Sequence, residues 1–341
     1  MRNETVSSVL EYIQKIQNIT GSHSEIAHHE YYSAKERTYR TKDTTYDMAI
    51  AKRVEEELKN VVDEEYAENR FSKRKEEVRY KFFYRGHFRR DYRLLPSVFR
   101  KNELRKEDYY YHEIMVRCPE HFQFLTHLDK LVLMQHYDCP TRLLDVTTNP
   151  LVALYFACKN FGCNTCDTFT GGTVHLFAKR DNEVVYSDSD KALMLSCIPK
   201  FTSDVKRDIW RLCQANLSAE KFVQRKGGSR YQDDNIERLF HEIATENPAF
   251  KRELVPLDLL QPLFVQPNKG NKRILKQDGA FILSGLSRNE DEAEEKIKKI
   301  WRVEINANNQ ETILKELEGL GIHEAVLFPE VDKVANYLKG Q

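Results

Sequence analysis

The sequence has no excess of charge of either sign, because 53 lysines and arginines balance 53 aspartates and glutamates. A net charge of zero argues against a protein that binds nucleic acid through bulk charge, although a local basic patch is compatible with it. No apolar run approaches the roughly 20 residues that cross a membrane. The first residues, MRNETVSSVLEYIQKI, also lack the apolar segment of a secretory signal. We therefore expect a cytoplasmic protein without membrane contact, for which nucleic acid is an unlikely partner.

Cysteine and histidine are present, but not in a pattern that indicates a metal site. Seven cysteines without a secretory signal are typical of reduced thiols in a cytosol. Cys163 and Cys166 form a single C-x-x-C motif, and zinc would need two more ligands, for which Cys158 and His175 are nearest. The histidine cluster at 23–29 has no cysteine and no i,i+4 pair, which favours a solvated surface. We predict no metal and no resident cofactor.

Helical and strand-like patterns divide the chain at about residue 75. Residues 1–75 are polar and read as an N-terminal helical extension, with a turn at 18–22 and a charged helix at 46–64. Residues 76–341 mix helical periodicity with short alternating segments and are expected to form one domain. The predicted strands cover residues 81–86, 143–146, 173–178, 263–265, 280–283, 301–305 and 325–328. The prediction is an α+β fold, in which helices surround a mixed sheet of short strands.

The stretch 134–157, MQHYDCPTRLLDVTTNPLVALYFA, places polar residues inside an apolar run. Buried polar groups cost free energy unless they pair, so these residues predict either a bonded network or a site. The candidate catalytic residues are His136, Arg142, Asp145 and Thr147. Asp145 would orient a substrate or act as a base, and His136 would move a proton, since unperturbed histidine titrates near neutrality. In the alternative, structural interpretation, Arg142 and Asp145 form a buried ion pair and His136 caps a helix.

The segment 81–86, KFFYRG, reads as a strand that ends at Gly86, where glycine permits close approach of another backbone. Arg85 follows apolar positions and is expected to point inward. The next segment, HFRRDYRLLPSVFR, is rich in arginine, including Arg93. It is either a phosphate cradle or a loop whose arginines pair with carboxylates such as Asp91. Its interleaved aromatics also suit, more weakly, a groove that follows a nucleic-acid backbone.

Three separate pieces of the chain resemble one family, the FRG domain, which is named for an aromatic-Arg-Gly motif. The first piece is YRG at 84–86 with the following LLPSVFR. The second, QHYDCPTRLLDVTTNPLVALYFA, is similar to the family pattern QHYG-PTRLLDWT-NP--ALYFA. The third is the tail, with Arg273, QDGAF, WRVEI, the ILKELEGLGI helix and LFPEVD. Together they span about residues 82–337.

Two residues depart from the family pattern. Asp138 replaces the usual glycine, which predicts a turn that tolerates a side chain. Val146 replaces the usual tryptophan and so removes an aromatic wall. The resemblance implies a bacterial protein from a family without a settled biochemical role.

A more distant likeness connects the chain to ADP-ribosyltransferases of the Arg-Ser-Glu type, which also open with a strand ending in an aromatic-Arg-Gly motif. This likeness implies that Arg85 binds a phosphate of a nicotinamide dinucleotide. The candidate binding residues are Tyr84, Arg85, Gly86, Arg93 and Gln277.

Such transferases also need a carboxylate that bonds the ribose hydroxyl and stabilises an oxocarbenium-like state. Asp145, Thr147 and Thr148 fall in the second motif, while QDGAF lacks the glutamate of the third. Asp278, Asp145 and Glu304 are the candidate carboxylates. The expected function is therefore binding of a nucleotide or of NAD as a substrate, with ADP-ribosyltransferase-like activity as the candidate reaction. A non-enzymatic interaction module with a structural Arg/Asp cluster is the alternative.

Overall fold

The computed structural model describes residues 5–33, 79–101, 103–159, 171–216, 222–223, 234–251, 253–297, 299 and 301–339. Within them, an eight-stranded mixed sheet has the order β1-β10-β4-β2-β3-β9-β8-β5. The strands in that order are β1 (Thr5–Val6), β10 (Trp301–Ile305), β4 (Thr173–Arg180), β2 (Tyr80–His87), β3 (Leu143–Thr147), β9 (Gly279–Leu283), β8 (Leu263–Gln266) and β5 (Val184–Tyr186). A separate pair consists of β6 (Phe222–Val223) and β7 (Glu253–Leu254). The predicted α+β fold with a mixed sheet is confirmed.

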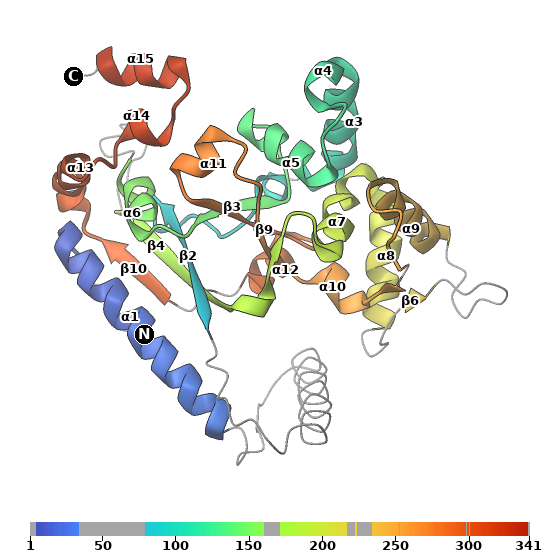
Figure 1. Ribbon diagram of the computed structural model, residues 1–341, viewed down its shortest axis with the longest axis horizontal. Coiled ribbons are helices and arrows are strands. Elements are labelled where there is room, and N and C mark those ends of the chain that lie inside the picture. Colours follow the sequence, from blue (N-terminus) through green and yellow to red (C-terminus); the bar gives the residue numbers. More distant parts are fainter. Residues whose placement is uncertain are drawn as a thin grey trace.

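Helices surround the sheet on both sides (Figure 1). They are α1 (Val9–Ser33), α3 (Glu107–Arg117), α4 (Pro119–Phe122), α5 (His127–His136), α6 (Pro150–Cys158), α7 (Asp190–Ser196), α8 (Ser203–Ala215), α9 (Asp234–Glu246), α10 (Pro256–Leu260), α11 (Lys272–Lys276), α12 (Glu290–Lys296), α13 (Gln310–Gly319), α14 (Glu324–Leu327) and α15 (Val331–Lys339). Short 3-10 helices, η1 (Ser97–Phe99) and η2 (Glu103–Lys106), lead into α3.

Two apolar clusters lie next to each other on one face of the sheet, because Tyr84 in one cluster and Leu143 in the other point to the same side. One cluster centres on α6, which packs with α1 and α13 against β2, β4 and β10. The other centres on α7 and includes side chains from α3, α5, α8, α9 and β9. Because the clusters are separate, the region between α6 and α5 is left without a continuous apolar filling.

The sheet is split between β2 and β3. All eight residues of β2 pair with β4, and all five residues of β3 pair with β9. Between β2 and β3 themselves, the register contains only Tyr84 opposite Thr147. Gly86 holds β2 against α6, since an added Cβ would lie 1.9 Å from the carbonyl oxygen of Ala153. The strands therefore diverge beyond Tyr84, and a gap opens at that point.

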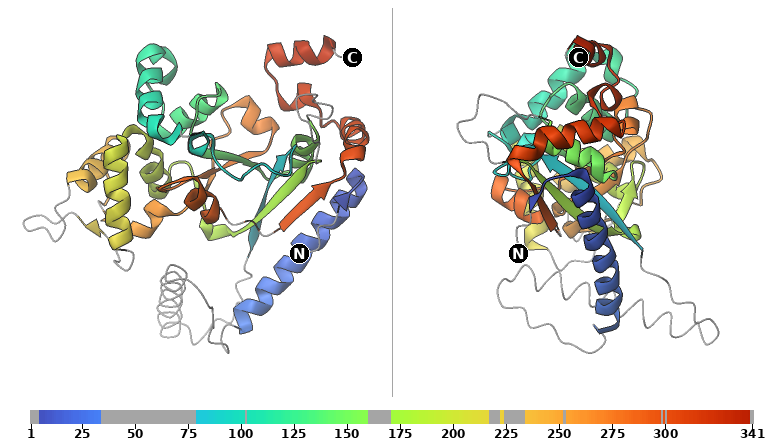
Figure 2. Two further views of the ribbon diagram at one scale, coloured as in Figure 1. Left: turned by 180° about the vertical axis from the view of Figure 1, so that it is seen from behind. Right: turned by 90° about the vertical axis from the view of Figure 1, so that its left-hand side faces the viewer.

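The described part of the N-terminal extension belongs to the sheet. β1 pairs in parallel with β10, and α1 runs along that edge of the molecule (Figures 1 and 2). The predicted turn at 18–22 is wrong, because α1 continues to Ser33. Tyr12 is fully buried and donates its hydroxyl to the carbonyl of Pro150, so tertiary packing holds the helix that precedes these turn-forming residues. The charged helix predicted at 46–64 and the domain boundary predicted at 75 lie outside the described residues.

One predicted strand is a helix. Residues 325–328 belong largely to α14, in which the amides of Val326 and Leu327 both donate to the carbonyl of His323. A short apolar run fits a buried helical turn as well as a strand, and here Leu327 is buried by the helical turn. The other six predicted strands are confirmed. Asp138 has a φ of 59°, so the expected turn in place of the family's glycine is confirmed too.

Candidate functional site

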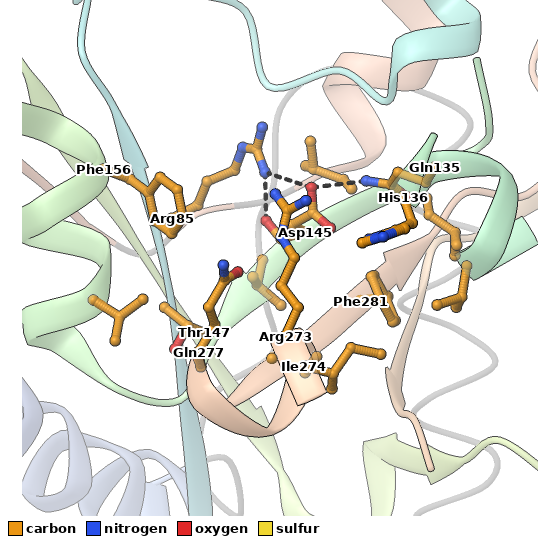
Figure 3. Close-up of a pocket in the computed structure, with 18 of the residues that line it drawn as sticks. Arg85, Gln135, His136, Asp145, Thr147, Phe156, Arg273, Ile274, Gln277 and Phe281 are labelled. Atoms are coloured by element: carbon orange, nitrogen blue, oxygen red, sulfur yellow. Dashed lines mark hydrogen bonds and ion pairs between the residues drawn. The ribbon is translucent and has the colours of Figure 1, made fainter. Parts of the chain in front are cut away.

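A pocket of about 350 Å³ opens where β2 and β3 diverge. Its walls come from β2, β3 and β9, from the C-terminal end of α5, and from α6 and α11 (Figure 3). This volume lies at the lower end of the range that holds small-molecule ligands, about 300–1,000 Å³. Phe156 on α6 and Phe281 on β9 supply aromatic surface to opposite sides of it. The pocket is thus the place to look for the predicted site residues.

Arg85 crosses the gap between the two strands. Its Nη1 donates to the main-chain carbonyl of Asp145 at 2.5 Å and lies 3.8 Å from Oδ2 of the same residue. Its Nε donates to Nε2 of His87 at 2.9 Å, so that imidazole is neutral and accepts. Burial lowers the pKa of Arg85 to about 10, against the opposing effect of Asp145, and the group stays charged at neutral pH. The predicted inward orientation of Arg85 is confirmed.

Asp145 presents its carboxylate to the pocket from β3. Gln135 at the end of α5 donates from Nε2 to Oδ2 of Asp145 at 2.7 Å. The hydroxyl of Thr141 in turn donates to Oε1 of Gln135 at 3.2 Å, which fixes the orientation of the amide. The Asp145 side chain remains 61% exposed, so its carboxylate is held in place and still accessible.

Two more guanidinium groups line the pocket. Arg100, just after η1, donates from Nε and Nη2 to the carbonyl of Leu95, and burial lowers its pKa. Arg273 extends from the first turn of α11, where Asn271 caps the helix, and lies 4.7 Å from the ring centre of Phe328. Within the described parts of the chain, neither arginine forms an ion pair. Both residues stand in pieces that carry the family resemblance, yet neither was among the candidate site residues.

The lining is positive overall. Three arginines face two carboxylates, Asp138 and Asp145. The rings of His136 and Tyr137 contact each other edge-on, with 5.1 Å between their centres. Guanidinium groups on a concave surface favour an anionic ligand, particularly phosphate or carboxylate.

Residues 80–163 match the FRG domain. The chain therefore contains an FRG domain. The match covers β2 to the segment after α6, and therefore includes the Arg85 strand, η1, α5, β3 and α6 that form most of the pocket. No curated protein and no solved structure is significantly similar to the chain.

Arg142, a predicted catalytic residue of the FRG domain, points away from the pocket. It is 1% exposed and donates from Nε and Nη2 to the two carboxylate oxygens of Glu107, at 2.7 and 2.5 Å. Nζ of Lys206 donates to the same carboxylate at 2.8 Å. The predicted ion pair between Arg142 and Asp145 is wrong, because residues an odd number of positions apart in an extended segment face opposite sides of the sheet.

The arginine-rich loop is mostly neutralised by carboxylates. Arg93 binds three of them on α12, at Glu290, Asp291 and Glu294, and does not line the pocket, so its predicted role in ligand binding is not supported by its position. Arg89 pairs with Asp91, and Arg90 pairs with Glu304. The carboxylate-paired interpretation therefore describes these three arginines, and Arg100 is the loop residue that faces the pocket. Glu304, buried with Arg90, is also outside the pocket.

The remaining predicted residues form the base of the FRG pocket. Thr147 donates its hydroxyl to the carbonyl of Gln277 at 2.7 Å and accepts from the amide of Asn149 at 2.9 Å. Gln277 donates from Nε2 to the carbonyl of Leu327 at 2.9 Å. Tyr84 is buried, and burial raises its pKa to about 12. These side chains hold β2, β3 and α11 together, and Asp278 lies outside the lining.

Neither a metal cluster nor a membrane span is found in the described part of the FRG-domain protein. No group of three or more His, Cys, Asp or Glu side chains there is placed to hold an ion. No helix in the same residues is long and apolar enough to cross a membrane. The C-x-x-C at Cys163 and Cys166 lies outside the described residues.

Proposed function

We propose that the FRG domain binds a phosphate-bearing nucleotide, with NAD as the leading candidate, in the gap between β2 and β3. The observation that carries this proposal is the convergence of Arg85, Arg100 and Arg273 on one pocket. Guanidinium groups bind phosphate through paired, charge-assisted hydrogen bonds. The aromatic rings of Phe156 and Phe281 offer apolar surface to a base or a nicotinamide ring.

Arg85 is the central phosphate ligand in this proposal. Its Nη2 has no hydrogen-bond partner among the described residues, while Nε and Nη1 are anchored to His87 and to β3. The neighbouring acceptors are a neutral imidazole and a carbonyl, and the Asp145 carboxylate is 3.8 Å away. An anion therefore meets a guanidinium group that is fixed in position by His87 and by an ion pair of 3.8 Å with Asp145, and whose Nη2 has no partner among the described residues.

The reaction that this arrangement supports best is transfer of an ADP-ribosyl group. Cleavage of the ribose–nicotinamide bond develops positive charge on the sugar, which a carboxylate stabilises. Asp145 is an accessible carboxylate of the pocket, and Gln135 holds it through a hydrogen bond of 2.7 Å. His136, also in the lining, supplies an imidazole for proton transfer.

Calorimetric titration with NAD, ADP-ribose and ADP tests the binding proposal. Arg273→Gln removes a pocket charge and is expected to weaken binding about tenfold or more, the usual worth of a charge-assisted hydrogen bond. Arg93→Gln is the matched control, because Arg93 is an arginine outside the pocket, and its Kd should be unchanged. Equal affinities for the two variants, or no binding of any of the three ligands, would overturn the proposal.

Nicotinamide release from NAD tests the reaction separately. Arg85→Lys keeps a cation in the gap but loses the planar group with several N–H donors. The rate of nicotinamide release should therefore fall by more than any loss of folded protein, followed through the melting temperature, can explain. Binding of NAD without release would remove the transferase activity and leave the binding function standing.

An interaction module without enzymatic activity is the second candidate. The observation in its favour is the burial of Arg142 with Glu107 and Lys206, which supports a structural role for this part of the motif. This candidate predicts that Arg273→Gln changes no property of the purified protein toward nucleotides.

A further inference from the structure

Asp138 brings a second carboxylate to the lining of the pocket, at the turn between α5 and β3, and the residue is exposed. Its main-chain amide donates to the carbonyl of Gln135 at 3.0 Å. Its carboxylate forms no hydrogen bond or ion pair with the described residues. Asp145, by contrast, is bonded to Gln135 and lies 3.8 Å from Arg85. Asp138 is therefore a charge of the pocket that the described part of the chain leaves without a partner.

The turn that carries Asp138 does not itself need a carboxylate. Asp138 has a φ of 59°, in the left-handed region that glycine adopts freely and that asparagine adopts as aspartate does. Glycine or asparagine would suit the same backbone. What aspartate adds at this position is a negative charge beside the pocket.

The polar residues of the lining follow one another from the gap in the sheet to this turn. Asp145 lies next to Arg85, with 3.8 Å between Oδ2 and Nη1. Gln135 connects Asp145 to the end of α5 through a hydrogen bond of 2.7 Å, and Asp138 follows Gln135 across the turn. Because the proposed reaction places a phosphate at Arg85 and the ribose at Asp145, the group beyond the ribose falls at the α5 end.

The α5 end of the pocket combines this carboxylate with an aromatic ring. Figure 3 shows His136 and Phe281 on the side of the pocket opposite Phe156. Asp138 comes two positions after His136. A carboxylate attracts a cation and accepts hydrogen bonds from N–H groups, and an aromatic ring attracts a cation over its face. The nicotinamide of NAD⁺ matches both, since its ring is positively charged and its carboxamide has two N–H donors.

We propose that Asp138 selects the nicotinamide end of NAD⁺, by attracting the positive ring and accepting a hydrogen bond from its carboxamide. This inference rests on the proposed binding of NAD and gives the ligand a direction in the pocket. The phosphates lie at Arg85 and Arg100, and the nicotinamide lies at the turn after α5, beside Phe281. NADH has an uncharged ring and ADP-ribose has no nicotinamide, so neither gains the attraction between the two charges.

Calorimetric titration of the full chain with NAD⁺, NADH and ADP-ribose tests the inference. The natural protein is expected to bind NAD⁺ about fivefold more tightly than NADH, the upper range for one pair of exposed charges. Asp138→Asn and Asp138→Gly should bring this ratio close to one without weakening the binding of NADH or ADP-ribose. Neither variant should lower the melting temperature, because both residues suit the turn. Arg273→Gln should weaken NAD⁺ and NADH alike and leave their ratio intact.

Asp188→Asn is the matched control, because Asp188 is an exposed aspartate that does not line the pocket. It removes the same charge from the molecule and should leave the ratio unchanged. Equal affinities for NAD⁺ and NADH in the natural protein, or a ratio that survives in both Asp138 variants, overturn the inference while NAD binding stands. A ratio that falls equally in Asp188→Asn overturns it as well, since net charge then accounts for the preference. Absence of binding by all three ligands overturns the proposed function and this inference together.

Discussion

Replacing Glu107 by glutamine is expected to destabilise the protein by about 3–5 kcal/mol, the usual cost of removing one partner from a buried ion pair. Glu107 is 2% exposed and accepts three hydrogen bonds, two from Arg142 and one from Lys206. Glutamine has the same shape but no charge, and its amide turns N–H donors toward one of the cations. Two buried positive charges then lack the carboxylate that compensates them.

Urea denaturation followed by circular dichroism at pH 7 measures this loss. Glu113→Gln is the control on the same helix, because Glu113 pairs with Arg117 at the surface, where the arginine side chain is 73% exposed. Exposed helical pairs contribute about 0.3–0.5 kcal/mol, so the control should unfold almost as the natural protein does. Equal losses in the two variants would refute the reasoning that burial makes the Glu107 network costly to break.

Acid titration gives the same prediction a second test. Burial by itself raises the pKa of Glu107, but the charges of Arg142 and Lys206 outweigh burial and hold the pKa at about 2. Since the folded pKa is below the ordinary value of 4.5, the stabilisation is complete above about pH 4.5 and is lost as the pH falls toward 2. The stability difference between the natural protein and Glu107→Gln should therefore shrink below pH 4.5.

Three further outcomes are expected. Burial lowers the pKa of two imidazoles below the ordinary 6.5. The pKa of His87, which also has Arg85 nearby, is about 2, and that of His175, which also has Lys299 nearby, is about 3. The unfolded chain thus binds more protons, and unfolding free energies should fall from pH 6.5 to 4 by up to about 1.4 kcal/mol per pH unit for each histidine, less steeply in His175→Gln. Gly86→Ala should lower the melting temperature markedly, because the added Cβ would meet main-chain atoms of α6. Gly319→Ala should leave the melting temperature unchanged, because its added Cβ would meet nothing within 4 Å. Asp145→Asn should abolish nicotinamide release yet keep nucleotide affinity within about threefold, as the proposed role of that carboxylate is in the transition state.

Periodicity in the sequence predicts the strands well but not their order. The alternation in 81–86, 173–178 and 301–305 is a local property, and each of these segments is a strand at that place. The parallel pairing of the two-residue β1 with β10 has no comparable signal, because it depends on α1 packing beside α13. The Ala325–Phe328 segment shows the same limit, since its apolar residues are buried equally well by a helical turn.

The family motif locates the pocket but does not distinguish the residues that line it from those that stabilise the fold. Arg85, His136 and Asp145 line one pocket, as expected from the motif. Arg142 stands three positions before Asp145, and the period of two already assigns the two residues to opposite faces. Its partner Glu107 lies 35 positions earlier, and no pattern in the sequence links them. Pairing over such separations follows from the packing of α3 and α8, which the residues alone do not specify.

The gap in the sheet explains why Arg85 lines the pocket. β2 pairs along its whole length with β4 and packs closely against α6 at Gly86, while β3 pairs along its whole length with β9. β2 and β3 therefore pair with each other at a single residue pair. Beyond that pair, the Asp145 carbonyl accepts from the Arg85 side chain. Arg85 thus bonds to an imidazole and a carbonyl and forms a longer ion pair, of 3.8 Å, with the Asp145 carboxylate. Burial lowers its pKa to about 10, so it keeps its charge at neutral pH. The divergence of the strands therefore creates the cavity and, at the same place, holds a guanidinium group in it, as the proposed binding of an anion requires.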